Sequence, residues 1–232
     1  MGFLDWIIAN REVIKIFYGL LIAIICLIIV SISHRLYHLS FYEGIRYFRN
    51  AFLFFGIAFI IRYIIGGFAN FGLISIDYLV PITILFEFFL IMAGFFLLYS
   101  LIWKRIEGTK GSFSSILNSR ILIFYVMAFI ITILDYLWGG YYFMFLSQIF
   151  IFVSATIISY INYARNGKKR GFLKFYFVAM VLALIAWILN AITAFIFNWE
   201  RSALVFVYFL NIIIFLLFLY GIIRIIKKPG KI

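Results

Sequence analysis

The sequence predicts an all-α integral membrane protein, a single domain over residues 1–232 built as a bundle of seven transmembrane helices. Two observations predict this class. First, 67% of the 232 residues are hydrophobic and only 12% are charged, whereas soluble domains carry about 25% charged residues. A soluble protein with a single hydrophobic core could not bury so many apolar side chains, and much of their surface would be exposed to water. Second, the apolar residues form long runs that charged or turn residues separate.

Seven of these runs are long enough to cross a hydrocarbon core of about 30 Å, which takes about 20 helical residues. They cover residues 13–33, 46–66, 79–103, 119–138, 141–163, 172–198 and 202–225. Because the runs are continuously apolar, they favour helices over barrel strands, in which lumen-facing positions are polar. Gly139 and Gly140 separate the fourth and fifth runs, so we expect a tight hairpin there.

The basic residues predict how the bundle lies in the cell membrane. Of the 20 Lys and Arg residues, all but Arg11, Lys15, Arg62 and Arg201 fall on one side of the predicted spans. Cytoplasmic connections carry the excess of Lys and Arg, so we expect the amino terminus outside and the carboxyl terminus in the cytoplasm. The net charge of +12 then faces anionic lipid headgroups, and it requires no nucleic-acid partner.

A weak internal similarity relates the first three runs to the last three. Ser33 and Tyr37 align with Ser159 and Tyr163, and the pair at 98–99 aligns with the pair at 219–220 in the same order. This predicts a 3+1+3 plan in which the fourth helix is a connector between two related triplets. Chance similarity is the open alternative, because the chain is so rich in Ile, Phe, Leu and Tyr.

Polar side chains are scarce inside the runs, and most lie in the predicted outer half. Each helix from the second to the seventh places one there, and we predict a ligand-binding pocket open to the outside. Its expected residues are Glu87, Asn190, Asn211, Gln148, Arg62, Asp135, Thr83, Trp187 and Tyr208. Intramembrane ionisable residues are functional candidates by default. The alternatives are that the amides only hold helices together and that Arg62 and Asp135 reach to the surface.

Other chemistry is not indicated. His34 and His38 are spaced as zinc ligands on a helix extending from the first run, and Glu43 follows as a weak third candidate. Catalytic zinc usually takes three protein ligands and structural zinc four, so we expect exposed histidines rather than a metal site. No nucleotide-binding, nucleophile-elbow or metalloprotease motif occurs, and we expect no enzyme.

The predicted topology, with a carboxylate on the third helix and Trp187 on the sixth, resembles the microbial rhodopsins. That resemblance implies a seven-helix fold with a pocket in the outer half. Rhodopsins bind retinal through a lysine in helix seven, whereas residues 202–223 contain none. Covalent retinal is thereby excluded, and no cofactor is expected. The abundance of Ile, Lys and aromatic residues is typical of AT-rich prokaryotic genomes, archaeal ones included.

Three hypotheses for function follow. The leading one is a receptor-like or sensory protein that binds a small molecule in the outer-half pocket and acts through a cytoplasmic or membrane protein partner. The second is a small-solute or proton-coupled transporter centred on Glu87. The third is a structural or assembly subunit whose polar residues only pack helices. A carrier needs a polar route to both faces, so an apolar floor beneath the pocket would favour the first hypothesis.

Overall fold

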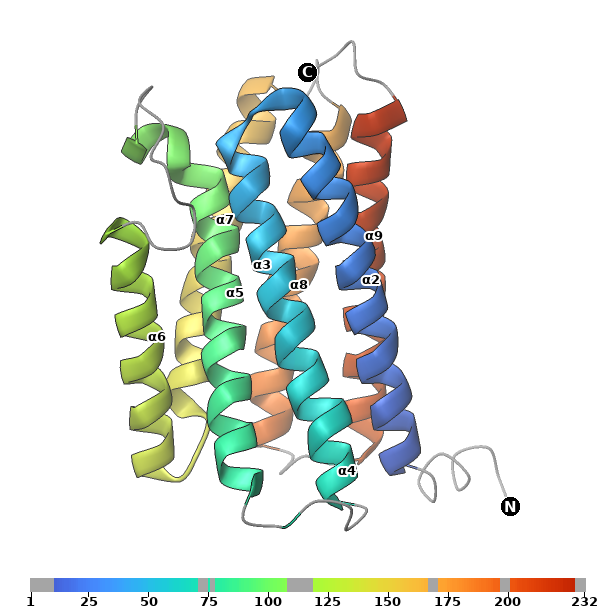
Figure 1. Cartoon of the computed structure of the whole chain (residues 1–232), viewed down its shortest axis with the longest axis vertical. Helices are drawn as coiled ribbons and strands as arrows, with labels where there is room; N and C mark the ends of the chain where they lie inside the picture. Colours follow the sequence, from blue (N-terminus) through green and yellow to red (C-terminus); the bar gives the residue numbers. More distant parts are fainter. Residues whose placement is uncertain are drawn as a thin grey trace.

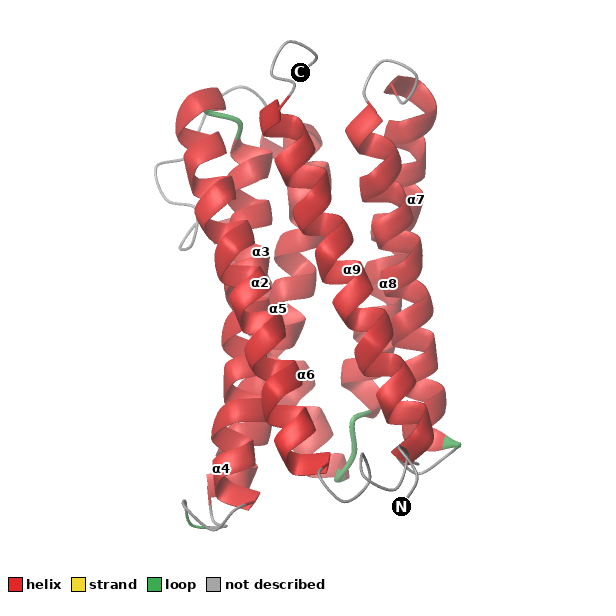
Figure 2. Cartoon of the chain, turned by 90° about the vertical axis from the view of Figure 1, so that its right-hand side faces the viewer, coloured by secondary structure: helices red, strands yellow, loops and turns green. Residues whose placement is uncertain are grey.

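A computed structural model describes residues 11–70, 75, 78–107, 119–166, 171–196 and 201–227. Every spanning segment among them is helical, and none of these residues lies in a strand (Figures 1 and 2). Seven helices are long and apolar enough to cross a membrane. The predicted seven-helix, multi-pass class is therefore confirmed. The sidedness and the internal repeat stay predictions.

The helices begin and end close to the predicted limits. In chain order they are α2 (Arg11–Ser40), α3 (Glu43–Phe59), the π-helix η1 (Ile60–Ile65), α4 (Gly66–Asn70), α5 (Leu79–Glu107), α6 (Ser119–Trp138), α7 (Tyr142–Asn166), α8 (Gly171–Phe195) and α9 (Arg201–Lys227). The first helix continues about two turns beyond its apolar run, and the second span is divided into α3, η1 and α4. The hairpin at Gly139, whose φ is +69°, joins α6 to α7 as predicted.

The spanning helices are arranged as a ring with one helix outside it. In the ring, α2 contacts α3, α3 contacts α5, α5 contacts α7, α7 contacts α8, and α8 contacts α9. Helix α9 contacts α2 and so closes the ring. Helix α6 packs against α5 and α7, and it lies at one edge of the bundle (Figure 1).

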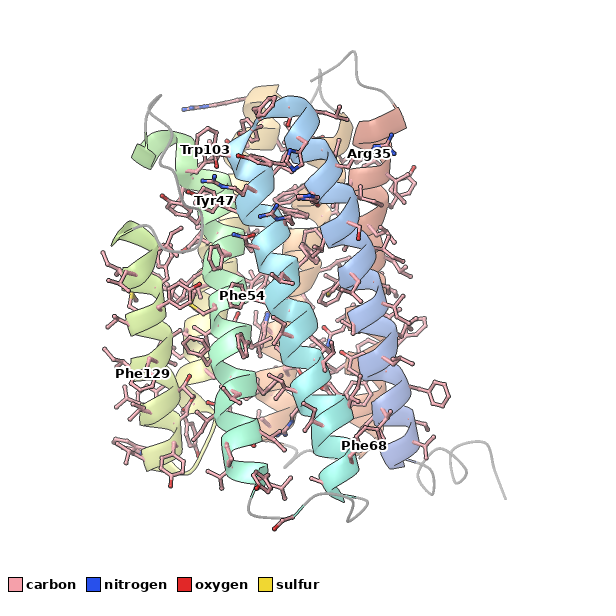
Figure 3. All side chains as sticks on the ribbon, viewed as in Figure 1. Arg35, Tyr47, Phe54, Phe68, Trp103 and Phe129 are labelled. Atoms are coloured by element: carbon pink, nitrogen blue, oxygen red, sulfur yellow. The ribbon has the colours of Figure 1, made fainter. Side chains whose placement is uncertain are left out.

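We call the end of the bundle at which α2 begins and the α6–α7 hairpin lies the outer end, after the predicted sidedness. The opposite end, where α9 ends, is the inner end (Figure 1). Toward the inner end, α3 and α5 are held together by aromatic rings. Tyr47 contacts Tyr99 with centroids 4.6 Å apart, and Phe54 stacks on Phe96 at 5.2 Å. In contrast, Phe129 on α6 extends away from the bundle (Figure 3) and is 57% exposed, as expected of a lipid-facing residue.

The π-helix η1 shapes the outer end of the second span. The N–H of Gly66 bonds to the carbonyl of Ile61, five residues earlier, which is the π-helical pattern and is often found at functional sites. A Cβ added to Gly67 would lie 2.7 Å from Cγ1 of Ile16 on α2. Glycine at this position therefore permits the close approach of α2 to the segment that carries Arg62.

Candidate functional site

A cavity of about 500 Å³ lies inside the ring of helices. Its lining comes from α2, α3, η1, α4, α5, α7, α8 and α9, together with Tyr141 before α7. Helix α6 contributes none of the lining residues that the structure describes. On α5 the lining extends from Leu79 to Leu97, a length of about 27 Å at 1.5 Å per residue. The cavity is therefore long and runs with the helices.

The two ends of the cavity differ in chemistry. Polar or hydrogen-bonding side chains line the outer part, namely Lys15, Arg62, Tyr63, Thr83, Tyr141, Trp187, Asn190, Tyr208 and Asn211. All of these are half-buried, whereas the inner part is lined by buried apolar side chains, namely Phe52, Leu97, Phe152, Ala183, Ile214, Phe215 and Phe218. The polar groups therefore gather toward the outer end of the cavity, and the inner end is an apolar floor.

Arg62 is the cation that η1 presents to this cavity. Its Nη1 donates a hydrogen bond to Oγ1 of Thr83 at 3.4 Å. The guanidinium also lies 5.4 Å from the ring centre of Phe86 and 5.9 Å from that of Tyr141. No carboxylate of the described residues lies within ion-pair distance of it. The direct contacts of Arg62 are thus neutral, although its charge also interacts with that of Glu87 beyond ion-pair distance.

The two asparagines in the lining have different partners. Asn190 donates from Nδ2 to the carbonyl of Ala186 on its own helix, at 2.9 Å. Asn211 donates to the hydroxyl of Tyr18 on α2 at 3.0 Å, and the Tyr18 ring stacks on Tyr208 with centroids 4.3 Å apart. Asn211 therefore connects α9 to α2, whereas Asn190 makes no bond to another helix among the described residues.

Glu87 is buried but lies outside the cavity lining. It is 4% exposed, and its Oε2 has no hydrogen-bond partner among the described residues. Its charge interacts with those of Asp135 and Arg62, but Thr83 bonds to Arg62 instead of to the Glu87 carboxylate. The carboxylate thus faces neither lipid nor the pocket in which we expected it.

Asp135 and Gln148 are also outside the lining, and each has a structural partner. Asp135, in the last turn of α6, accepts hydrogen bonds from the N–H groups of Phe143 and Met144 at 2.8 and 2.7 Å. It therefore caps the start of α7, where backbone N–H groups lack helical partners. Gln148 on α7 donates to the carbonyl of Leu90 on α5 at 3.1 Å. Neither side chain is free to reach a ligand in the cavity.

Some aromatic residues of the outer half line the cavity, and others lie on the outside of the bundle. Tyr63, Tyr141, Trp187 and Tyr208 line the cavity. Tyr136, Trp138 and Tyr142 are more than half exposed and point to the surroundings. Of the nine residues expected in the pocket, the structure brings together Arg62, Thr83, Trp187, Asn190, Tyr208 and Asn211. Ligand binding by them stays a prediction.

The histidines at the inner end do not form a metal centre with Glu43. The rings of His34 and His38 are in edge contact, with centroids 4.5 Å apart, and Nδ1 of His34 lies 3.0 Å from Nη1 of Arg49. Glu43 instead pairs with Arg46 at 2.6 Å and accepts a bond from Tyr37. No group of three or more potential ligands occurs in the part of the chain that the structure describes.

Sequence reasoning missed Lys15 and Tyr18 as residues of the outer part. Lys15 lines the cavity, and Tyr18 holds Asn211. One signal was available: Lys15 is among the four basic residues at the predicted outer side. The π-helix had no such signal in the sequence beyond the two glycines that follow it.

Comparison with known proteins adds a single finding. The sequence matches no family model, and no solved structure matches it. It is similar to a protein of Archaeoglobus fulgidus described as uncharacterised, with 25% identity over 218 residues that cover 89% of this chain and 90% of that protein. The likeness therefore extends over most of the length of both chains.

Proposed function

We propose that this protein is a receptor-like membrane protein that binds a small molecule in the cavity from the outer side. The observation that carries the proposal is the cavity itself, which has polar groups at one end and about 500 Å³ of space. Ligand sites are typically clefts of about 300–1,000 Å³, mostly apolar with a few polar groups that fix orientation. The arrangement here has all of these properties.

Two observations favour binding over the other hypotheses. A carrier needs a polar route through the bundle, but the lining beneath Leu90 is apolar and includes Leu97, Phe152 and Phe218. A purely structural subunit would use its polar residues to join helices, but among the described residues Asn190 bonds only within its own helix, and it lines the cavity. Binding would be communicated through the inner end, where basic connections are available to a cytoplasmic partner.

A thermal-unfolding screen of the purified protein in detergent tests the proposal. The panel should include sugars, amino acids, nucleosides, quinones and fatty acids. A ligand at 100 times its Kd stabilises the folded state by about 2.7 kcal/mol. The variant Ala186→Phe fills the cavity wall, and Ile188→Phe adds a ring on the lipid-facing side of the same helix.

We expect a class of compound that stabilises the native protein and Ile188→Phe but not Ala186→Phe. The proposal is wrong if no compound stabilises the protein, or if stabilisation is unchanged in Ala186→Phe.

A further inference from the structure

We propose, building on the function above, that the ligand is a single-chain amphiphile with an anionic headgroup, which binds at Arg62 while its hydrocarbon chain fills the apolar floor. The inference rests on three properties of the cavity: the charge of its polar end, the chemistry of its floor and its shape.

The polar end is cationic. Arg62 lines it, and no Asp or Glu is among the lining residues that the structure describes. The partners of Arg62 are the Thr83 hydroxyl and two aromatic rings. A guanidinium has five N–H donors in a planar fork that suits carboxylate and phosphate. A cation at this depth is costly, and Glu87, whose charge interacts with it, makes no ion pair with it, so an anionic ligand group would stabilise it.

The floor excludes a fully polar ligand. Inward of Thr83 on α5, the cavity is lined by Phe86, Leu90 and Leu97. The lining from the other helices at this level is also hydrocarbon or aromatic, with Phe52, Phe152, Phe215 and Phe218. A sugar or amino acid placed there would lose its bonds to water without replacement, whereas an alkyl chain gains about 0.8 kcal/mol per buried methylene.

The shape of the cavity favours one chain. Its volume of about 500 Å³ extends over about 27 Å of α5, so it is narrow for its length. A single extended chain fits such a space better than a compact ring system or a lipid with two chains. The asparagines of the outer part, Asn190 and Asn211, supply amide groups beside the headgroup position.

Quenching of tryptophan fluorescence by brominated chains tests this inference in nanodiscs of zwitterionic lipid. Trp187 lines the cavity, so a dibromo-octadecanoate in the cavity should quench it saturably, and Trp187→Phe should remove that saturable component. The matched alcohol, dibromo-octadecanol, has the same chain without the charge. Arg62→Gln tests the headgroup contact. Arg224→Gln is the matched control, since Arg224 also lies over a phenylalanine ring, Phe175 at 4.8 Å, but outside the cavity.

We expect the acid to bind about tenfold or more tightly than the alcohol, as one charge-assisted contact allows. Arg62→Gln should abolish that difference, and Arg224→Gln should preserve it. A dibromo-octadecyl phosphate shows which anionic headgroup the site prefers. If it binds more tightly than the acid, the ligand is a single-chain lipid phosphate. If it binds more weakly, the ligand is a free fatty acid.

If the native protein binds the acid and the alcohol equally well, the proposal that the ligand has an anionic headgroup is wrong. Saturable quenching that survives in Trp187→Phe overturns the location. If both chains fail to bind while the thermal screen finds a polar ligand that depends on Ala186, the ligand class is wrong and the proposed function stands. If the thermal screen also finds nothing, both proposals fail.

Discussion

Two groups of polar residues lie at similar depth in the outer half of this bundle, and they differ in what they face. Arg62, Asn190 and Asn211 line the cavity inside the ring of helices. Asp135 and Gln148 are buried among α5, α6 and α7, where each bonds to the backbone of a neighbouring segment. We call these the cavity group and the packing group.

The difference teaches that residue type and depth do not determine the role of a polar side chain in a membrane. Gln148 and Asn190 are both amides, but Gln148 joins two helices and Asn190 bonds to the helix that carries it. The partner decides the role. The packing group should therefore control stability, and the cavity group should control binding.

The largest effect on stability is expected from Asp135→Ala. This change removes an acceptor that is 1% exposed and that two backbone N–H groups of α7 share. Loss of a charged cap should lower the free energy of unfolding by about 3 kcal/mol, measured by denaturation in mixed micelles. Asp135→Asn keeps one acceptor oxygen and should lose about half as much. An unchanged unfolding curve for Asp135→Ala would remove Asp135 from the packing group.

A substitution at Gly94 tests how tightly the packing group is enclosed. A Cβ at Gly94 would lie 2.9 Å from Oε1 of Gln148, whereas one at Gly221 would meet nothing within 4 Å. We expect Gly94→Ala to destabilise the bundle by about 1–3 kcal/mol and Gly221→Ala to leave it unchanged or more stable. Combining Gly94→Ala with Gln148→Ala should cost less than the sum of the two changes. Strict additivity would contradict the contact.

Gln148→Leu should have a moderate effect. It removes the bond from Nε2 to the carbonyl of Leu90 across α7 and α5. Interhelical hydrogen bonds in membranes contribute about 0.6–2 kcal/mol, so a loss in that range is expected in the same denaturation assay. Ligand-induced stabilisation should be retained, because Gln148 is not in the cavity lining. If Gln148→Leu instead lost ligand binding and kept normal stability, Gln148 would belong to the cavity group.

Asn190→Leu should have the smallest effect on stability, less than about 0.5 kcal/mol. In the part of the chain that the structure describes, its amide bonds only to Ala186 of the same helix, so no link between helices is lost. Binding of the probe that the thermal screen identifies should nevertheless weaken, because the side chain lines the outer part of the cavity. A strong loss of stability here would show that Asn190 joins helices after all.

The sequence predicts the positions of the spans well, but it predicts only in part which side chains of each span face the cavity. Uninterrupted apolar length suffices to locate α6 at Ser119–Trp138, because hydrocarbon thickness sets that length. The same uniformity hides which side of each helix faces inward. Successive residues on a helix differ by about 100°, so Thr83 and Glu87, one turn apart on α5, were expected to face the same site. Only the packing of α6 and α7 against α5 shows that the cavity includes Thr83 and not Glu87.

The sequence also gave no indication of the π-helical geometry of η1. Hydropathy treats residues 46–66 as one uniform span, whereas the backbone changes to π-helix at Ile60–Ile65. The capping role of Asp135 depends on the hairpin that brings the start of α7 back to the end of α6. That partner lies eight residues on in the chain, and the pattern of apolar runs does not reveal it.

Accessibility of single cysteines to a membrane-impermeant thiol reagent tests the central claim most directly, namely that water enters the cavity from the outer end and reaches the cavity group but not the packing group. Cys26 is the only cysteine and is buried, so Cys26→Ala supplies a background without thiols. In that background, Asn190→Cys should react rapidly when the reagent is added to the outer face of intact cells, and Gln148→Cys should not react. Equal reactivity at the two positions, or reaction of Asn190→Cys only from the cytoplasmic face, would contradict the account.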